Sequence, residues 1–307
     1  MNTSITSNWR PLLRAVSAFL TAFAALAANA SAQTTLYVSA FGFGLPPSGT
    51  VTAYDPNSGT VLSGSGFPIT GFNVPVGLAI GGNTLYVADR STGTVTAYDA
   101  GKGTPAKNFM PITKLKKPSG LAVDGSVLYV SSYESGTVTA YDANSGAVDQ
   151  GFKQITGLNK PSGLAVGPGH ILYVASCGTS FNGGTVGAYD NEGDAFEFNP
   201  LVTGLSVPSG LASAGNVLYV AEEGSGTVAA YTLDATGFKS ATPIPNFNPP
   251  GLTGPTGLVV TNSGNGGNLF VVSTGNGTVR EYNAKTGAPI NPSFLSNLPG
   301  PTGIAVK

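Results

Sequence analysis

The sequence predicts an all-β fold, a six-bladed β-propeller with four antiparallel strands in each blade. Three observations lead to it. A Leu-Tyr-Val segment, or its variant Leu-Phe-Val, recurs six times at intervals of 43 to 51 residues. Each copy is followed by Gly-Thr-Val, and a Pro-x-Gly segment also recurs six times. The segments are rich in Val, Tyr and Thr, and no apolar period of 3.6 residues separates them, which favours strands over helices.

Each copy of the repeat is long enough for four short strands. Residues 117–142, "KPSGLAVDGSVLYVSSYESGTVTAYD", contain three of them: one after Pro-x-Gly, one at Leu-Tyr-Val and one at Gly-Thr-Val. A looser apolar stretch such as residues 152–158, "FKQITGL", supplies the fourth. Gly, Asn, Asp and Ser fill the turns between strands. Four strands repeated six times at this period are typical of a β-propeller.

The two ends of the repeat array predict how the ring closes. Residues 35–40, "TLYVSA", form a second strand with no Pro-x-Gly segment before them, and residues 300–306, "GPTGIAV", form a first strand with no partner after them. If this last strand pairs with the first one, the sixth blade is complete. We therefore expect the C-terminal strand to join the N-terminal blade and leave no open sheet edge at the seam.

Residues 1–32 have the pattern of a secretory signal peptide. Arg10 and Arg14 precede an apolar run at residues 15–26, and small residues end the segment at Ala32. No later segment approaches the roughly 20 apolar residues that a membrane-spanning helix needs. We expect one propeller domain over residues 33–307, in a monomer that is secreted or periplasmic, with no transmembrane segment after the signal is removed.

Charge and composition narrow the class of partner. Outside the expected signal peptide 12 basic residues stand against 15 acidic ones, a net charge of −3. Nucleic acid is excluded as an expected partner, because phosphate binding depends on clustered Lys and Arg. Only 9% of all residues are charged, so Ser, Thr, Asn and Gly must cover much of the surface. A protein, a glycan or a small ligand is left as partner.

The quoted repeat resembles the NHL type, whose pattern is Pro-x-Gly, a hydrophobic residue, Ala-Val-Asp, then Leu-Tyr-Val, a short turn and a strand that ends in Asp. It is also similar to the YVTN-type repeats of exported prokaryotic propellers. The resemblance covers nearly all of residues 34–307. It implies a six-bladed propeller and leaves the activity open, since such propellers include binding scaffolds, lactonases and lyases.

The repeats can be compared with those of metal-dependent hydrolases that share this fold. The resemblance extends distantly to gluconolactonase-like propellers, in which carboxylate and amide ligands hold an axial cation, several of them just before the glycine of an innermost strand. The matching positions here are Val76, Ser119, Ser162, Ser209, Thr256 and Thr302. Hard cations prefer charged oxygen ligands, so we expect no metal and no cofactor. A ligand from another loop would escape this argument, and a hydrolase or lyase with a diverged site stays as the alternative function.

Other reactive residues are few. The single histidine, His170, lies in a turn between two expected strands, and the Pro-Ser-Gly serines have no base near them in sequence. The single cysteine, Cys177, is expected to be buried. Asp55, Asp99, Asp142 and Asp190 end third strands, where short acidic side chains cap turns. Whether Cys177 or the loop acids Asp89, Glu134, Glu222 and Glu223 have a role is left open.

Differences between copies give the candidate binding site. Seven residues separate the Val of Leu-Tyr-Val from the Thr of Gly-Thr-Val in four copies, whereas 12 do so in the first copy and 11 in the fourth. These longer loops bring Phe41, Phe43 and Phe181 toward an axial mouth, unless they are ordinary loop variation. We therefore expect a non-enzymatic binding or scaffold propeller, with Ser119, Ser162, Ser209, Thr256, Thr302 and these three phenylalanines as binding residues.

Overall fold

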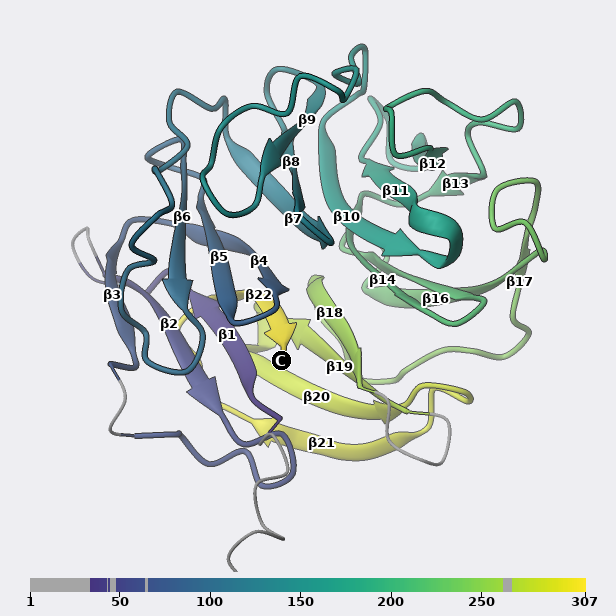
Figure 1. Cartoon of the computed structure of the whole chain (residues 1–307). Helices are drawn as coiled ribbons and strands as arrows, with labels where there is room; N and C mark the ends of the chain where they lie inside the picture. Colours follow the sequence, from purple (N-terminus) through teal and green to yellow (C-terminus); the bar gives the residue numbers. More distant parts are fainter. Residues whose placement is uncertain (1–33, 43, 45–47, 64–65, 262–266) are drawn as a thin grey trace, which may run out of the picture. The chain divides into compact units, whose positions relative to one another are not determined.

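The strands of the protein lie in six antiparallel sheets arranged around a central axis (Figure 1). The computed structural model describes residues 34–42, 44, 48–63, 66–261 and 267–307, and the strands of the ring named below lie within these ranges. The expected signal peptide at residues 1–32 and the candidate residue Phe43 lie outside the described residues. The predicted six-bladed β-propeller is confirmed.

We number the blades from the N-terminus, and each begins with its innermost strand. Blade 1 consists of β22 (Pro301–Val306), β1 (Leu36–Ala40), β2 (Gly49–Tyr54) and β3 (Ile69–Phe72). Blade 2 consists of β4 (Pro75–Gly81), β5 (Thr84–Asp89) and β6 (Thr94–Asp99), and blade 3 of β7 (Pro118–Asp124), β8 (Val127–Ser132) and β9 (Thr137–Asp142).

The second half of the ring has the same order. Blade 4 consists of β10 (Pro161–Gly167), β11 (Ile171–Ser176), β12 (Gly184–Tyr189) and β13 (Val202–Leu205). Blade 5 consists of β14 (Pro208–Ala214), β15 (Val217–Glu222), β16 (Thr227–Leu233) and β17 (Ala241–Pro243), and blade 6 of β18 (Pro255–Thr261), β19 (Asn268–Ser273), β20 (Thr278–Asn283) and β21 (Pro289–Leu295). The described loops also contain the 3-10 turns η1 (Pro168–His170) and η2 (Thr274–Asn276).

The outer edges of blades 2 and 3 differ from the other four. Their fourth segment forms only isolated bridges, such as Val95 with Ile112 in blade 2 and Val138 with Ile155 in blade 3. Both isoleucines are nevertheless buried. The apolar side chain of the expected fourth strand therefore still packs into the blade, although the ladder of backbone hydrogen bonds is short.

The ring closes as the sequence predicts. The C-terminal strand β22 pairs antiparallel with β1, with Leu36 opposite Val306 and Tyr37 opposite Ala305. Figure 1 shows this junction where β22 (yellow) lies next to β1 (purple). Each innermost strand also contacts the innermost strand of the next blade, and β22 contacts both β4 and β18. Blade 1 is therefore built from both ends of the chain.

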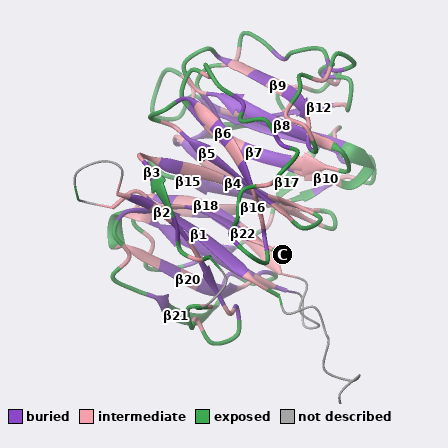
Figure 2. Ribbon diagram, turned by 60° about the vertical axis from the view of Figure 1, so that its left-hand side comes forward, coloured by how far each residue is buried: buried purple, intermediate pink, exposed green. Residues whose placement is uncertain are grey.

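Tyrosines of the Leu-Tyr-Val segments hold neighbouring blades together. The ring of Tyr86 is buried against Phe109, with 5.6 Å between the ring centroids, and its hydroxyl donates a hydrogen bond to the carbonyl oxygen of Ala143 in blade 3, 2.6 Å away. Tyr37, Tyr173 and Tyr219 make the same bond to the blade that follows each. Figure 2 shows buried residues running along the strands of every blade. The expectation that these tyrosines are interface residues is confirmed.

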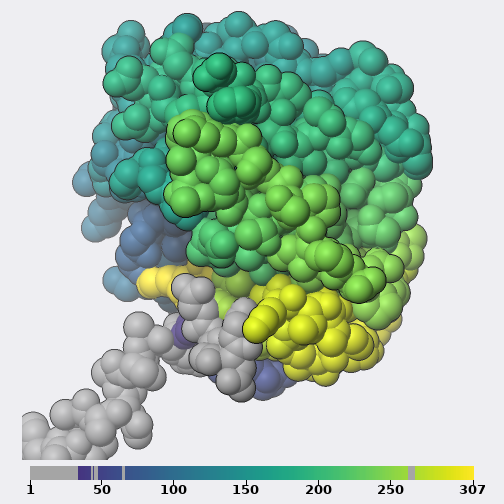
Figure 3. All heavy atoms as spheres, turned by 90° about the vertical axis from the view of Figure 1, so that its right-hand side faces the viewer, coloured from purple at the N-terminus to yellow at the C-terminus, as the bar shows by residue number. Residues whose placement is uncertain are grey.

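The blades are stacked so closely at the axis that the Pro-x-Gly glycine has no room for a side chain. A Cβ on Gly120 would lie 2.1 Å from the carbonyl oxygen of Ser162, and one on Gly163 would lie 2.2 Å from that of Ser209. Glycine at this position is what lets adjacent innermost strands approach. From the side, successive parts of the chain form adjoining bands, from teal through green to yellow (Figure 3).

Candidate functional site

A cavity of about 520 Å³ opens at the axis, between the first residues of the six innermost strands. Its volume lies in the range of small-molecule sites, roughly 300–1,000 Å³. Its walls carry one apolar side chain from each blade: Leu78, Leu121, Leu164, Leu211, Leu258 and Ile304. Two further sets of side chains line it, each also with one member from every blade. We call the residues between Pro and Gly of the Pro-x-Gly segments the axial ring: Val76, Ser119, Ser162, Ser209, Thr256 and Thr302.

The second set follows the second strand of each blade. Counting five residues on from the Leu of Leu-Tyr-Val or Leu-Phe-Val gives one residue per blade, and all six line the cavity. We call them the variable ring, because no two are alike: Phe41, Arg90, Tyr133, Cys177, Glu223 and Thr274.

Four hydroxyls of the axial ring hold the blades together. Each donates a hydrogen bond to a backbone carbonyl oxygen of the next blade. The bonds are Ser162 to Pro208 (2.7 Å), Ser209 to Pro255 (2.8 Å), Thr256 to Thr302 (2.9 Å) and Thr302 to Pro75 (2.7 Å). Their partners are half-buried or buried, so the loss of such a bond leaves a desolvated carbonyl. These four hydroxyls are structural groups of the ring.

The other two members of the axial ring make no such bond. Val76 has no hydroxyl, and the half-buried hydroxyl of Ser119 donates to no group within the described ranges. In blade 3 another serine takes over the bridging role: Ser131 accepts a hydrogen bond from the backbone N–H of Gly120 (2.7 Å) and donates one to the carbonyl oxygen of Ser162 (2.6 Å). The side of the cavity formed by blades 2 and 3 therefore keeps an uncommitted hydroxyl.

The axial ring does not fit the divalent-cation site that the gluconolactonase-like resemblance implies. A hard cation needs several oxygen ligands with negative charge among them. The ring offers five hydroxyls, and four of them donate their protons to carbonyl oxygens. In the described part of the chain, no three His, Cys, Asp or Glu side chains come together in a way that would hold a metal ion.

The six members of the variable ring are held on equivalent backbone. The N–H of each donates a hydrogen bond to the carbonyl oxygen of the residue before the Pro-x-Gly proline, at distances such as 2.9 Å from Arg90 to Val74 and 3.1 Å from Glu223 to Val207. Val207 has a φ of 50°, a left-handed conformation that is strained for a β-branched side chain. The repeat thus fixes where each side chain starts, and only its chemistry differs between blades.

Arg90 lies over the ring of Tyr133, with 4.5 Å between its guanidinium carbon and the ring centroid. The preceding carboxylate, Asp89, is buried and satisfied by the backbone rather than by Arg90. It accepts hydrogen bonds from the N–H groups of Asn73 (2.7 Å), Val74 (3.1 Å), Ser91 (3.1 Å) and Thr92 (3.3 Å). The guanidinium has no acidic partner among the described residues. It is a half-buried cation that faces the cavity.

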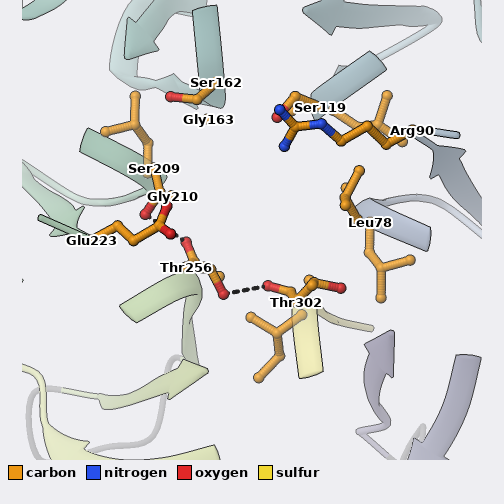
Figure 4. Close-up of a pocket in the computed structure, with 18 of the residues that line it drawn as sticks. Leu78, Arg90, Ser119, Ser162, Gly163, Ser209, Gly210, Glu223, Thr256 and Thr302 are labelled. Carbon is orange, nitrogen blue, oxygen red and sulfur yellow. Dashed lines mark hydrogen bonds between the residues drawn. The ribbon is translucent and has the colours of Figure 1, made fainter. Parts of the chain in front are cut away.

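Glu223 supplies a carboxylate to the same cavity from blade 5, and its side chain makes no hydrogen bond or ion pair to any described residue. Figure 4 shows Arg90 and Glu223 reaching toward the opening from opposite sides. The other loop acids have other partners. Glu222 accepts a hydrogen bond from the N–H of Ser206 (2.7 Å), and Glu134 pairs with Lys117 (2.6 Å), which lowers the pKa of this exposed carboxyl.

Cys177 is buried in the cavity wall, as the sequence predicts, and its thiol lies 3.4 Å from the carbonyl oxygen of Pro208. Burial is the main cause that raises the pKa of this thiol, so it stays protonated at neutral pH. The neighbouring Glu223 raises the pKa as well, whereas Lys160 and Arg90 lower it. Charges of both signs therefore act on this wall of the cavity.

The aromatic residues expected at the mouth are not all brought together. Phe41 is half-buried and lines the cavity. Phe181 is 61% exposed and is not among the lining residues. The sequence comparison of loop lengths missed Arg90, Tyr133 and Thr274. Aligning the six copies on Leu-Tyr-Val, column by column, would have found them, since they occupy the same column as Phe41, Cys177 and Glu223.

His170 lies far from the axial serines. It ends η1, after β10, whereas Ser162 is at the start of that seven-residue strand, and seven residues of strand span about 23 Å. Its exposed ring places Nδ1 2.7 Å from Oδ2 of Asp124 in blade 3. The expectation of a loop histidine is confirmed, and it contacts a neighbouring blade rather than a serine.

Fold and cavity together define a β-propeller with an axial pocket, and comparisons with known proteins agree with the fold. Residues 47–149, about a third of the chain, match the family model described as outer membrane protein assembly factor BamB. A solved structure described as the crystal structure of a nidogen/laminin complex is similar with a TM-score of 0.66 and 16% identity. The match covers 89% of this chain and 98% of that one. No curated protein matches the sequence.

The described residues contain no helix that is long and apolar enough to cross a membrane.

Proposed function

We propose that this protein is an exported, non-enzymatic binding propeller of the NHL or YVTN type, which receives its ligand in the axial cavity. One observation supports this most strongly: six unlike side chains occupy one repeat position, on equivalent backbone, around a single opening. A position that served only the repeat would carry similar residues in every blade, as the axial ring does. Binding groups are expected where the repeats differ.

The chemistry of the two rings supports binding rather than covalent catalysis. Four axial hydroxyls are engaged in bonds between blades, and the hydroxyl of Ser119 has no base next to it. The raised pKa of Cys177 keeps its thiol protonated, which makes it a poor nucleophile. Arg90, Tyr133 and Glu223, by contrast, present charged and aromatic groups to the cavity. Such groups orient and hold a ligand.

Export of the protein is part of the proposal and is supported by the pattern of residues 1–32. A low charge content and a single cysteine are compatible with a secreted or periplasmic monomer whose stability comes from a closed β core. The BamB model matches too little of the chain to choose between propeller families, so the NHL or YVTN affiliation stays a proposal based on the repeat pattern.

The test is to fill the cavity without breaking a bond between blades. Ser119→Trp puts a large ring at the opening at the one axial position whose hydroxyl is uncommitted. Ser126→Trp is the matched control, since Ser126 is exposed in the turn at the other end of the same hairpin. Native mass spectrometry, after exposure to a small-molecule extract of the producing cells, measures the bound mass.

We expect a stoichiometric ligand on the wild type and on Ser126→Trp, and none on Ser119→Trp. A ligand retained equally by both variants, or no bound ligand in any of the three proteins, would contradict the proposed function. Circular dichroism of the three proteins verifies that each is folded.

A further inference from the structure

We infer that the side of the cavity formed by blades 2 and 3 is a carboxylate receptor, and that the ligand is a small organic acid whose other end donates a hydrogen bond to Glu223. This inference rests on the proposed function and specifies the chemistry of the same site. Three features of the described residues support it: a guanidinium without an acidic partner, a free hydroxyl beside the same strands, and a carboxylate on the opposite wall.

The guanidinium of Arg90 is available because every acid near it is engaged elsewhere. Asp89, its neighbour in sequence, accepts four backbone N–H groups, and Glu134 in the next blade pairs with Lys117. Partial burial removes some of the water around this cation, so a ligand that supplies a negative charge gains from pairing with it. The cavity is the open space that Arg90 faces.

The contact with Tyr133 restrains the guanidinium of Arg90. Its carbon lies over the aromatic ring, 4.5 Å from the ring centroid, which is a cation–π contact. Two parallel N–H groups of a guanidinium match the two oxygens of a carboxylate, which is the geometry that distinguishes Arg from Lys. A restrained guanidinium loses less conformational freedom when it binds, so this contact favours recognition of an acid.

The hydroxyl of Ser119 is a second donor on the same side of the cavity. The other axial hydroxyls donate their protons to the next blade, whereas in blade 3 Ser131 donates that hydrogen bond instead of Ser119. Val76 in blade 2 adds an apolar contact and no competing acceptor. Among the described residues, the only axial hydroxyl without an acceptor is therefore in blade 3, which also carries Tyr133 and lies next to the blade of Arg90.

Glu223 on the opposite wall defines what the rest of the ligand must be. It is a carboxylate without a partner among the residues described, so it would repel a simple dianion and attract an ammonium or hydroxyl group. Arg90 and Glu223 make no ion pair with one another across the opening. A molecule with an acid at one end and N–H or O–H donors at the other satisfies both charges.

Two sources share this chemistry, the zwitterionic amino acids and short peptides on one hand and the sugar acids on the other. Each acid is paired with a neutral analogue, so that the need for a carboxylate is tested separately from the class of the ligand. L-alanyl-L-alanine is compared with its C-terminal amide, and D-glucuronate is compared with D-glucose. Titration calorimetry at low salt, up to millimolar probe, gives the dissociation constant of each for the wild type and the variants.

We expect at least one of the two acids to bind, and to bind about tenfold or more tightly than its neutral partner. Arg90→Gln should raise the dissociation constant of that acid about tenfold or more, and Arg90→Lys should raise it less. The control Lys102→Gln removes a charge from an exposed turn outside the cavity and should leave the dissociation constant unchanged. Glu223→Gln should weaken binding of the dipeptide more than binding of glucuronate, and Glu192→Gln, at an exposed position, is the matched control.

Failure of the inference and failure of the proposed function give different results. If neither acid binds, if the neutral partners bind equally well, or if Arg90→Gln and Lys102→Gln behave alike, the carboxylate receptor is wrong. If, at the same time, Ser119→Trp still abolishes binding of a neutral molecule from the extract, the binding propeller stands and only its ligand class is overturned. Because the side chain of Arg90 makes no hydrogen bond or ion pair to a described residue, its variants are expected to remain folded.

Discussion

The axial ring and the variable ring surround the same cavity but differ in role. The axial ring carries five hydroxyls and a valine, and four of the hydroxyls bond the next blade. The variable ring carries six unlike side chains, and its backbone rather than its side chains makes the repeated bond. In a repeat protein, similar residues in every copy indicate a role in the fold, and differences between copies indicate where binding has been built.

The contrast extends into the axial ring itself. Ser162, Ser209, Thr256 and Thr302 make one continuous arc of bonds from blade 4 through blade 6 to blade 1 and on to blade 2. The arc is interrupted at Val76 and Ser119, in the two blades that also carry Arg90 and Tyr133, and Ser131 makes the bond from blade 3 to blade 4 instead. The axial side chains of blades 2 and 3 thus make no bond to the next blade, and perturbing each part of the axial ring separately should show two different consequences.

The largest effect is expected from opening the ring. Deleting residues 301–307 removes β22, which pairs with β1 and contacts β4 and β18. Loss of its buried Ile304 and Ala305 and of its ladder hydrogen bonds should cost more than about 5 kcal/mol, comparable to the whole stability of many domains. We expect no cooperative unfolding transition in urea. Deletion of Lys307 alone is the control and should keep the transition, and a truncated protein within about 2 kcal/mol of the wild type would contradict this view of closure.

A smaller effect is expected within the axial ring, and it should depend on the blade. Ser162→Ala and Ser209→Ala each remove a bond between blades and should lower the free energy of unfolding by about 1–2 kcal/mol. Ser119→Ala is a matched control at the equivalent position and should change it by less than about 0.5 kcal/mol. Urea unfolding measures all three. Equal losses at the three positions would show that Ser119 is a structural residue too.

Alkaline pH should weaken the interfaces between blades that the tyrosines build. Burial is the main cause that raises the pKa of Tyr129 and of Tyr173 to about 12, from an ordinary value near 10. The folded state therefore favours the neutral phenol, and this stabilisation is complete below pH 10 and is lost as the pH rises toward 12. Tyr173→Phe should flatten the decline of unfolding free energy over this range, and Phe270 at the equivalent position of blade 6 shows that the repeat accepts phenylalanine. If the unfolding free energy of Tyr173→Phe fell with pH as steeply as that of the wild type, Tyr173 would not be the source of the decline.

The fold was predictable from the sequence because its signals are repeated six times. Leu-Tyr-Val, Gly-Thr-Val and Pro-x-Gly gave the strands, and the unpaired "TLYVSA" and "GPTGIAV" segments gave the closure. The reduction of the fourth strand to bridges in blades 2 and 3 was not predictable, because outer segments vary in sequence and an isolated bridge preserves the same buried isoleucine.

The site was predictable only in part. Sequence placed Ser119, Ser162, Ser209, Thr256 and Thr302 around the axis, but it did not show which hydroxyls are engaged, since that depends on distances to the next blade. Loop length singled out Phe41, which lines the cavity, and Phe181, which does not. Loop length does not single out Arg90, which only a column-by-column alignment of the copies would have found. Its contact with Tyr133, 43 residues away in sequence, joins two blades and is visible only in the closed ring.

One measurement tests the central claim most directly: the thermal unfolding midpoint of Arg90→Gln and Ser209→Ala, each with and without the acid that binds the wild type. A ligand that binds only the folded state raises this midpoint. We predict that Arg90→Gln keeps the wild-type midpoint without ligand and loses the ligand-induced rise, whereas Ser209→Ala starts lower and keeps the rise. A lowered midpoint for Arg90→Gln with an intact ligand-induced rise would contradict the division of the two rings into binding and structure.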